Sequence, residues 1–219
     1  MKLHGDPIAI NVHRVMVFAN EKGIDLPIEK VDVIKGENLE DAYLKINPRG
    51  TMPVLELDNG RYLEEAPAIN QYLESRYPEP NLCGTDPESR AFITARERWV
   101  EFEGLSPAGD VLRNSVPFFE GRSLPGHAGR VDCQPVLIDR GKQRLELFYK
   151  LFEDRISQSK YVAGDAFSMA DITACLVFGF ATASPIGAGV PLPETHTHTK
   201  RWLDEVFARP SFAFLRETG

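Results

Sequence analysis

The chain between Asn47 and Glu65 runs NPRGTMPVLELDNGRYLEE, and this stretch decides the fold of the first part of the protein. Two short strand-like segments, Met52–Leu57 and Arg61–Glu64, flank an Asp-Asn-Gly sequence at residues 58–60. An Asn-Gly pair between two such segments is typical of a tight turn, because both residues tolerate the left-handed backbone that the turn needs. The stretch therefore predicts a β-hairpin.

Helix and strand patterns alternate around this hairpin. Before it we predict a strand at Met1–Gly5, a helix at Asn11–Lys22, a strand at Ile28–Ile34 and a helix at Glu37–Ile46. After it comes a helix at Glu65–Tyr77, with Pro67 in the first turn, where its missing N–H does no harm. The predicted order, β-α-β-α-β-β-α, is that of a small α/β domain.

Beyond Pro78 the pattern changes, and no strand alternation is evident. The remaining helices are predicted at Pro87–Glu103, with an extension toward Phe118 after an interruption near Pro107 and Gly109, at Pro135–Ile156, after the capping-box sequence of residues 168–171, and around Trp202–Phe207. The Pro- and Gly-rich residues 79–86 look like a linker. The predicted division is an α/β domain at 1–78, a linker at 79–86 and an all-α domain at 87–219.

Composition narrows the class of protein. The 219 residues include 25 Lys and Arg against 32 Asp and Glu, a net charge of −7, which disfavours a nucleic-acid partner. Cys83, Cys133 and Cys175 lie far apart, so we expect reduced thiols in a cytoplasmic protein rather than disulfides or a zinc site. The uncharged stretch 172–192 is interrupted by Pro and Gly, so we expect a buried helix and a loop there, not a membrane span.

Two features of the first domain suit a peptide-like ligand. If the Met52–Pro53 bond is cis, the Met52 N–H and C=O turn outward and can pair with an extended peptide. Glu65 opens a helix, whose N-terminal N–H groups favour a carboxylate, while the Glu65 side chain itself could take an ammonium group. A ligand with a peptide backbone, a free amine and free carboxylates would suit this site.

On these and further motifs, the sequence resembles the cytosolic glutathione transferases, in particular those of the bacterial theta/phi-like kind. The matching segments cover nearly the whole chain: MKLHGDP (1–7) with Asn11-x-x-Arg14-Val15, NPRGTMPVLEL (47–57), LEEAPAINQYLESRYPEP (63–80), YVAGDAFSMADI (161–172) and RWLDEVFARPS (201–211). The resemblance implies a thioredoxin-like N-terminal domain with a mixed four-stranded sheet, a cis Met52–Pro53 bond, a helical C-terminal domain and a homodimer. It also implies glutathione as co-substrate without a metal, and a transferase that conjugates small hydrophobic electrophiles in detoxification.

The resemblance also implies the residues of the site, with three departures. The glutathione-binding set is Met52, Pro53, Glu65, Ala66, Asn38 and Arg49. Ala9 stands where the family has its catalytic serine, Ala66 where a serine follows the binding acid, and Asn38-Leu39 where a His-Lys pair is often found. Each departure removes a side-chain donor. Arg49 or Lys35 could replace the missing pair near the glycyl carboxylate.

Asn11 is the candidate catalytic residue, because its amide NH₂ can donate to a thiolate at the start of a helix. Some relatives that reduce disulfides or peroxides have Asn at this position. The alternative is that Asn11 is only the helix N-cap.

Other residues leave alternatives open. Trp99, Phe118 and His13 are candidates for the electrophile site, although an aromatic residue at helical spacing is more often part of a core. His196 and His198 could bind a metal, but an exposed loop or helix start is the simpler interpretation. Three functions remain: a glutathione transferase, a glutathione-dependent disulfide or peroxide reductase, and a non-catalytic binding or scaffold protein with the same fold.

Overall fold

The computed structural model describes residues 1–126, 129–184 and 187–217, and the chain divides into two compact units. The first unit consists of residues 1–80 with 124–131, and the second of residues 81–123 with 132–219. The division at residue 80 lies inside the predicted linker, so residues 81–86 belong to the helical unit. There the Met169 N–H donates a hydrogen bond to the Leu82 carbonyl at 3.0 Å, which ties this segment to the helices.

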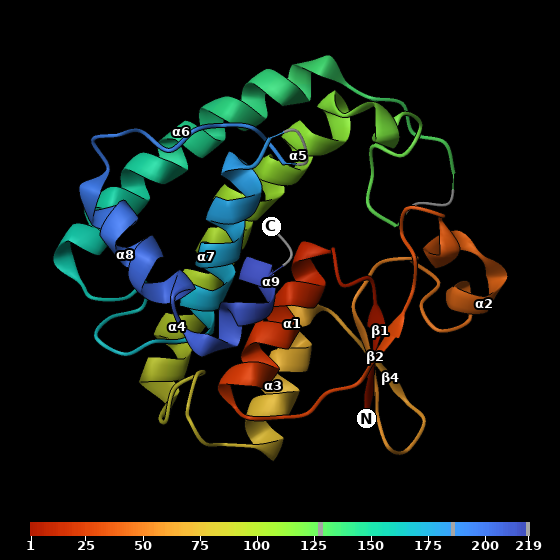
Figure 1. The fold of residues 1–219 in the computed structure, drawn as a ribbon, viewed down its shortest axis with the longest axis horizontal. Coiled ribbons are helices and arrows are strands. Elements are labelled where there is room, and N and C mark those ends of the chain that lie inside the picture. The colour runs from red at the N-terminus through yellow and green to blue at the C-terminus, as the bar shows by residue number, and fades with distance from the viewer. Residues whose placement is uncertain (127–128, 185–186, 218–219) are drawn as a thin grey trace. The chain divides into compact units, whose positions relative to one another are not determined.

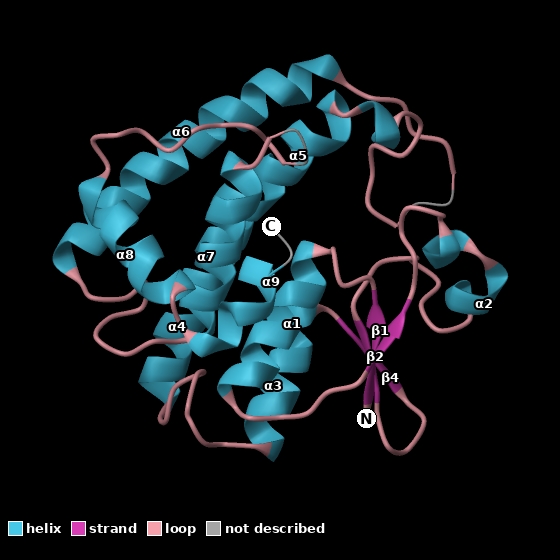
Figure 2. Ribbon diagram, viewed as in Figure 1, coloured by secondary structure: helices cyan, strands magenta, loops and turns pink. Residues whose placement is uncertain are grey.

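The first unit is built on the expected mixed four-stranded sheet, whose strands are magenta in Figure 2. The strand order is β2-β1-β3-β4. β1 (Lys2–Gly5) is parallel to β2 (Ile28–Lys30) and antiparallel to β3 (Val54–Glu56), which pairs in turn with β4 (Tyr62–Glu64). Gly60, in the turn between β3 and β4, has a φ of +78°. The hairpin prediction is confirmed.

Helices cover both faces of this sheet. Figure 1 shows α1 (Ile10–Glu21) and α3 (Ala66–Arg76) side by side on one face and α2 (Asp41–Leu44) on the other. Leu3 and Leu55, which are paired across β1 and β3 and fully buried, point to one face because side chains alternate along a strand. The predicted order β-α-β-α-β-β-α is confirmed.

A buried lysine joins the ends of α1 and α3. The Lys22 Nζ donates to the carbonyls of Tyr77 (2.7 Å) and Pro80 (2.8 Å) and lies 2.7 Å from Glu74 Oε2. Its side chain is fully shielded from solvent, so these partners replace the water that the ammonium group would otherwise bind. The C-terminal ends of the two helices are therefore held together.

Two elements are shorter than the sequence pattern predicts. β2 ends at Lys30, because the Asp32 carboxylate accepts hydrogen bonds from two following backbone N–H groups, at 3.1 Å each, and turns the chain. The helix predicted over Glu37–Ile46 is interrupted at Glu40, whose backbone is extended. It becomes a short 3₁₀ turn followed by α2.

The second unit contains helices and, within its described residues, no strand of the kind found in the first unit (Figure 2). They are α4 (Pro87–Val100), α5 (Ser106–Ser115), α6 (Pro135–Gln158), α7 (Met169–Thr182), α8 (Thr197–Phe207) and the short α9 (Ala213–Glu217). Phe152 of α6 lies at the centre of their core, with ring centroids 4.7 Å from Phe178 and 4.8 Å from Trp202. An all-α second domain is confirmed.

A π-helical turn, Glu101–Leu105, joins α4 to α5. The interruption predicted near Pro107 and Gly109 is this turn, whose last residue is Leu105. Pro107 has no N–H, so the Phe102 carbonyl, five residues earlier, lacks its helical donor; Arg144 donates to that carbonyl instead. The wider turn also keeps the proline ring away from the preceding carbonyl groups. Gly104 in this turn fits closely, because a Cβ there would lie 2.8 Å from Val177 Cγ1.

α7 begins at the predicted capping box. The Asp171 carboxylate accepts hydrogen bonds from the Ser168 N–H (3.0 Å) and hydroxyl (3.1 Å), and also from the Val162 N–H (2.9 Å) and the Trp202 indole (3.0 Å). Burial outweighs these donors and raises the pKa of Asp171 to about 6.

The uncharged stretch 172–192 forms most of this buried helix, and its residues 185–186 lie outside the described residues. Across the described ranges, none of the helices has both the length and the apolar character needed to cross a membrane.

Candidate functional site

The candidate site begins where β1 ends at Gly5. A Cβ at Gly5 would lie 2.6 Å from Val12 Cγ2 and 3.8 Å from the Pro53 Cα, so a side chain does not fit without displacing Val12. The first turn of α1 and the residue Pro53 are therefore neighbours, each next to Gly5. This close approach brings together two of the segments that the sequence predicted to form the site.

Asp6 holds the loop between β1 and α1. Its carboxylate is 2% exposed and accepts hydrogen bonds from the Val33 N–H (2.9 Å) and the Ile8 N–H (3.2 Å). These bonds fix the loop to the chain after β2. The Ile8 side chain, in contrast, is 60% exposed, which places an apolar group on the surface just before α1.

The N-cap of α1 is Ala9, with extended backbone angles. The Ala9 carbonyl accepts hydrogen bonds from the N–H groups of Val12 (2.9 Å) and His13 (3.0 Å), which places Asn11 inside the first turn. The alternative that Asn11 is the N-cap is therefore wrong. The N–H groups of Ile10 and Asn11 make no hydrogen bond with any residue that the structure describes, as expected for the start of a helix.

The Asn11 side chain is oriented by Arg14, whose Nη1 donates to the Asn11 Oδ1 at 3.0 Å. A guanidinium group can only donate, so the amide oxygen must face it and the NH₂ group must face away. His13, which directly precedes Arg14 in the helix, has its Nε2 2.6 Å from the Pro7 carbonyl. Burial lowers the pKa of His13, so this ring is a neutral donor to the loop near pH 7.

The Met52–Pro53 bond is cis, as the resemblance implied. The β1–β3 pairing of His4 with Val54, if continued, would join Asp6 to Met52. Instead, the Asp6 N–H lies 3.2 Å from the Met52 Sδ, and the Met52 backbone N–H and C=O make no hydrogen bond within the described part of the chain. They are available to an extended ligand.

Three side chains hold the loop that precedes Met52. The Tyr43 hydroxyl and the Asn47 amide donate to the Thr51 carbonyl at 2.7 and 2.8 Å, and the Asn38 Nδ2 donates to the Gly50 carbonyl at 2.8 Å. Asn38 is 5% exposed, so its amide supports the loop from inside the domain. A direct contact between Asn38 and glutathione stays a prediction.

Gly126, in a stretch that the sequence assigned to the helical domain, lies against the same loop. A Cβ on Gly126 would be 2.2 Å from the Arg49 carbonyl and 2.5 Å from Thr51 Cγ2, so the two backbones are in direct contact. Gly126 has a φ of +64°, which also favours glycine. A segment distant in sequence thus packs behind the candidate binding loop.

Glu65 is the N-cap of α3 and has an unusual backbone, with φ 69° and ψ 119°. The pairing of Val54 with Glu64 sets Glu65 next to Pro53 across the hairpin. The Ala66 N–H, at the first position of α3, makes no hydrogen bond with a described residue. A helix N-terminus with an unpaired N–H therefore lies beside the Met52–Pro53 segment.

The Arg49 side chain forms an ion pair with the Glu65 carboxylate. The Arg49 Nη2 is 2.6 Å from Glu65 Oε1, and both side chains are more than half exposed. The sequence analysis offered Arg49 for the glycyl carboxylate of glutathione; the structure places its guanidinium at the residue predicted to bind the amine. Lys35, the other cation considered, lies 3.5 Å from Asp32.

The two aromatic candidates for the electrophile site differ in their surroundings. Trp99 is stacked on Phe152, with centroids 6.1 Å apart and planes 12° from parallel, inside the aromatic core of the second unit. Phe118 follows α5 and keeps 37% of its surface exposed, with Arg122 5.0 Å above the ring. Trp99, of intermediate exposure, is therefore partly committed to the core, whereas Phe118 is more accessible.

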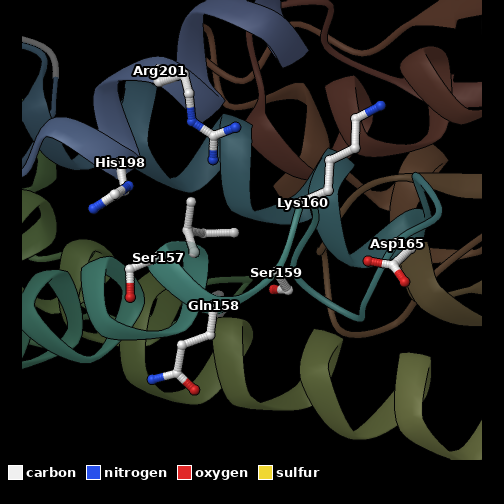
Figure 3. Close-up of a pocket in the computed structure, with 8 residues that line it drawn as sticks. Ser157, Gln158, Ser159, Lys160, Asp165, His198 and Arg201 are labelled. Atoms are coloured by element: carbon white, nitrogen blue, oxygen red, sulfur yellow. The ribbon is translucent and has the colours of Figure 1, made fainter.

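Two hollows in the second unit contain none of the predicted site residues. One, of about 370 Å³, lies between the end of α6 and the start of α8 and is lined by Ser157, Gln158, Lys160, His198, Arg201 and neighbouring residues. Figure 3 shows that its charged ends are spread apart rather than gathered about one point. The other, of about 400 Å³, lies beside Phe92 of α4.

His196 and His198 lie at the start of α8, and the His198 N–H donates to Glu153 Oε1 at 3.0 Å. This is the helix start that the sequence analysis gave as the alternative to a metal pair. In the ranges that the structure describes, no group of three His, Cys, Asp or Glu side chains is arranged to hold a metal ion.

Gly5, Asp6 and Arg14 belong to the segments that match the family, but the sequence alone gave them no role at the site. Arg14 follows Asn11 by three residues, a spacing that puts both side chains on one face of a helix, so the pair could have been found. Gly5 ends a strand, and nothing local indicates which helix will approach it. Asp6 accepts from a residue far along the chain, which no sequence motif indicates.

Comparisons with known proteins agree with this arrangement. Sequence profiles of the glutathione S-transferase N-terminal and C-terminal domains match residues 10–76 and 137–210, respectively. Glutathione S-transferase 3 of Zea mays is 31% identical over 214 residues, which cover 97% of this chain and 91% of the relative.

Solved structures show the same fold over the whole length. A glutathione S-transferase domain-containing protein from Marinobacter aquaeolei matches with a TM-score of 0.88 and 28% identity, covering 97% of this chain and 100% of that one. Gtt2 from Saccharomyces cerevisiae also has a TM-score of 0.88, at 26% identity, covering 98% of this chain and 100% of that one. The thioredoxin-like first domain and the helical second domain are thereby confirmed, and the chain belongs to the glutathione S-transferase family of enzymes.

Proposed function

We propose that this protein is a glutathione transferase that joins the thiol of glutathione to small apolar electrophiles. The observation that carries the proposal is the unpaired Met52 backbone beside the Glu65–Arg49 pair and the free Ala66 N–H. Glutathione offers a peptide backbone in its middle and an amino-acid group, with one amine and one carboxylate, at its γ-glutamyl end. The two sets of groups are complementary.

Binding follows from these partners. The Met52 N–H and C=O pair with the cysteinyl backbone of glutathione as an added strand would. Glu65 takes the γ-glutamyl ammonium, while Arg49 and the Ala66 N–H take the neighbouring carboxylate. The Arg49–Glu65 pair is exposed, and such pairs contribute only about 0–1 kcal/mol, so exchanging it for the charges of a ligand costs little.

Chemistry requires the thiolate form of glutathione. A free thiol has a pKa of about 8.5, and only the thiolate is strongly nucleophilic. Ala9 offers no hydroxyl, but the free N–H groups of Ile10 and Asn11 and the Asn11 amide can donate to the sulfur. The thiol proton passes to water, the sulfur forms a bond to the electrophilic carbon, and a leaving group such as chloride departs with its electron pair.

The electrophile is expected to be apolar near the sulfur. The exposed Ile8 side chain lies just before the proposed thiolate donors, and His13 spends its Nε2 on the Pro7 carbonyl. Phe118 is the more accessible aromatic candidate on the second unit, whereas Trp99 is half-buried and stacked on Phe152.

The test separates the three functions. Calorimetric titration with glutathione measures binding, and turnover is measured with chlorodinitrobenzene, hydroxyethyl disulfide and cumene hydroperoxide. We expect binding together with conjugation. Turnover of only the disulfide or the peroxide would support a glutathione-dependent reductase, for which the same Asn11-stabilised thiolate would serve. Binding without turnover would leave a scaffold protein, and no binding would refute the proposal.

From the family we also propose a cytoplasmic homodimer. The first unit, residues 1–80 with 124–131, is small and therefore has a limited core of its own. Sedimentation velocity at micromolar concentration should give twice the 24.5 kDa chain mass, and a species of 24.5 kDa alone would refute the dimer.

A further inference from the structure

Arg14 is a charged side chain in the interior of the first unit. It is 2% exposed and lies on α1, three residues after Asn11. Its guanidinium group is a planar cation whose N–H groups can only donate hydrogen bonds. One of its hydrogen bonds, from Nη1 to the Asn11 Oδ1 at 3.0 Å, goes to the residue that we assign to the glutathione sulfur.

This bond determines which half of the Asn11 amide faces outward. The two ends of an amide have nearly the same shape, and without a partner either could point toward a ligand. Because the guanidinium group only donates, the oxygen is held on Arg14 and the NH₂ group is left without a hydrogen bond among the described residues. The other amide orientation would turn an acceptor oxygen toward the thiolate, which would repel it.

The same bond also strengthens the donor. A cation bound to an amide oxygen draws electron density from the nitrogen, so the NH₂ protons become better donors. Hydrogen bonds in series reinforce one another by roughly 10–30%. This effect is largest where the cation is shielded from water, as Arg14 is. The free N–H groups of Ile10 and Asn11 point to the same end of the helix.

We propose that Arg14 is a positioning residue for glutathione transfer: it fixes and polarises the Asn11 amide so that its NH₂ group donates to the sulfur. The inference rests on the proposed function and adds a residue to it.

Neighbouring groups do not offer the same control. His13 donates to the Pro7 carbonyl and is neutral near pH 7, since burial lowers its pKa. The Asp6 carboxylate accepts from the Val33 and Ile8 N–H groups. Lys35 lies at Asp32, 3.5 Å away, on the chain after β2. Arg14 is the cation bonded to the Asn11 side chain.

The experiment is a double-mutant cycle on the thiol pKa of bound glutathione, followed by thiolate absorbance against pH. The variants are Arg14→Gln, Asn11→Ala and the double variant. We expect Arg14→Gln to raise the thiol pKa by roughly 0.5–1 unit and to lower kcat/KM near pH 7 by roughly three- to tenfold, with KM for glutathione changed less than about twofold. In the Asn11→Ala background, Arg14→Gln should add nothing, because it acts through that amide.

Further variants keep the inference testable if Arg14→Gln folds poorly. Arg14→Lys retains the charge but loses the planar group, so we expect an intermediate thiol pKa. Asn11→Asp has nearly the same shape and keeps a partner for Arg14, but it replaces the NH₂ donor by a second oxygen. We expect it to raise the thiol pKa further than Asn11→Ala does. The exposed Arg61→Gln on the same unit is the matched control and should leave the thiol pKa and rate unchanged.

Two results would overturn the inference while leaving the proposed function intact. One is a wild-type protein that conjugates glutathione together with a folded Arg14→Gln or Asn11→Asp variant in which the thiol pKa of bound glutathione is unchanged. The other is an equal effect of Arg14→Gln with and without Asn11, which would mean that Arg14 acts on stability or on the helix as a whole. Failure of the wild-type protein to bind glutathione would overturn both.

Discussion

Glu65 combines a strained backbone with the carboxylate that we assign to the glutathione amine. Its φ of 69° is in a region where a residue with a Cβ costs about 1–3 kcal/mol. We expect Glu65→Gln, which keeps the strain, to raise KM for glutathione at least about tenfold, because a charge-assisted bond of about 1.5–3 kcal/mol is lost. Glu65→Gly should lose the same binding but be more stable than Glu65→Gln by about 1 kcal/mol. Glycine relieves the backbone strain, and its larger conformational entropy in the unfolded chain offsets part of that gain.

Urea unfolding and calorimetric titration of both variants test this prediction together. The Gln variant is the matched reference, since it differs from Gly in the side chain and from wild type in charge alone. A Gly variant less stable than the Gln variant would show that the backbone at Glu65 is not strained.

Single residues also show which features of the site can be predicted from the sequence. The presence of Asn11 near a helix start was predictable, but its position relative to the cap was not. The cap is set by the Ala9 carbonyl, which accepts the first helical hydrogen bonds, and alanine carries no capping signal. Likewise, Asn38 aligned with a ligand-binding position, yet its donor group is used on Gly50. Side-chain partners depend on the folded loop, which local sequence does not specify.

At the scale of elements, the start of α7 depends on the buried Asp171. Its pKa, about 6, is above its ordinary value of 3.8, so the folded protein binds this proton more tightly than the unfolded chain does. The stability that this proton contributes is therefore present below about pH 4 and is lost as the pH rises through about 6. The shift corresponds to about 3 kcal/mol.

Asp171→Asn does not titrate and therefore isolates this effect. We expect the variant to be less stable at about pH 4, because two buried donors lose acceptors, at roughly 1–3 kcal/mol each. The difference from wild type should shrink between about pH 4 and pH 6.5. Fluorescence of Trp99 and Trp202, both in the second unit, follows the unfolding of that unit. A difference that stays constant with pH would contradict the prediction.

Element boundaries were predicted best where backbone chemistry is local. The hairpin turn and the capping box of α7 were both confirmed, because Asn-Gly and Ser-x-x-Asp act within a few residues. β2 and α2 are shorter than predicted, since side chains such as Asp32 compete for backbone N–H groups. The π-helical turn has no characteristic composition, so the sequence predicts an interruption near Pro107 and Gly109 but not its form.

At the scale of the whole molecule, the cysteines and the proposed thiolate site belong to different units. Cys83, Cys133 and Cys175 all lie in the second unit, and burial raises the thiol pKa of Cys133 and of Cys175. We expect the variant with all three replaced by Ala to keep kcat/KM with glutathione within about threefold, when folding is verified by circular dichroism. A loss above about tenfold, or about 1.4 kcal/mol, would mean that a protein thiol takes part.

The return of residues 124–131 to the first unit is the part of the molecule that the sequence predicted least. Their Gly and Pro content indicates a connection but not its destination. Gly126 contacts Arg49 and Thr51, which lie far from it in the sequence. This contact therefore depends on the folded course of the chain and not on local sequence. The overall division into an α/β unit and a helical unit followed from periodicity alone.

The π-helical turn Glu101–Leu105 has a consequence for the history of the chain. Ser106 N–H bonds to the Glu101 carbonyl, five residues back, so the turn holds one residue more than a regular helix would. In a relative from which Glu101 or Glu103 is deleted, α4 and α5 would join as one regular helix. Such a relative would also have to replace Pro107, whose ring a regular helix does not accommodate. Deletion in this turn and substitution of that proline should therefore have been inherited together.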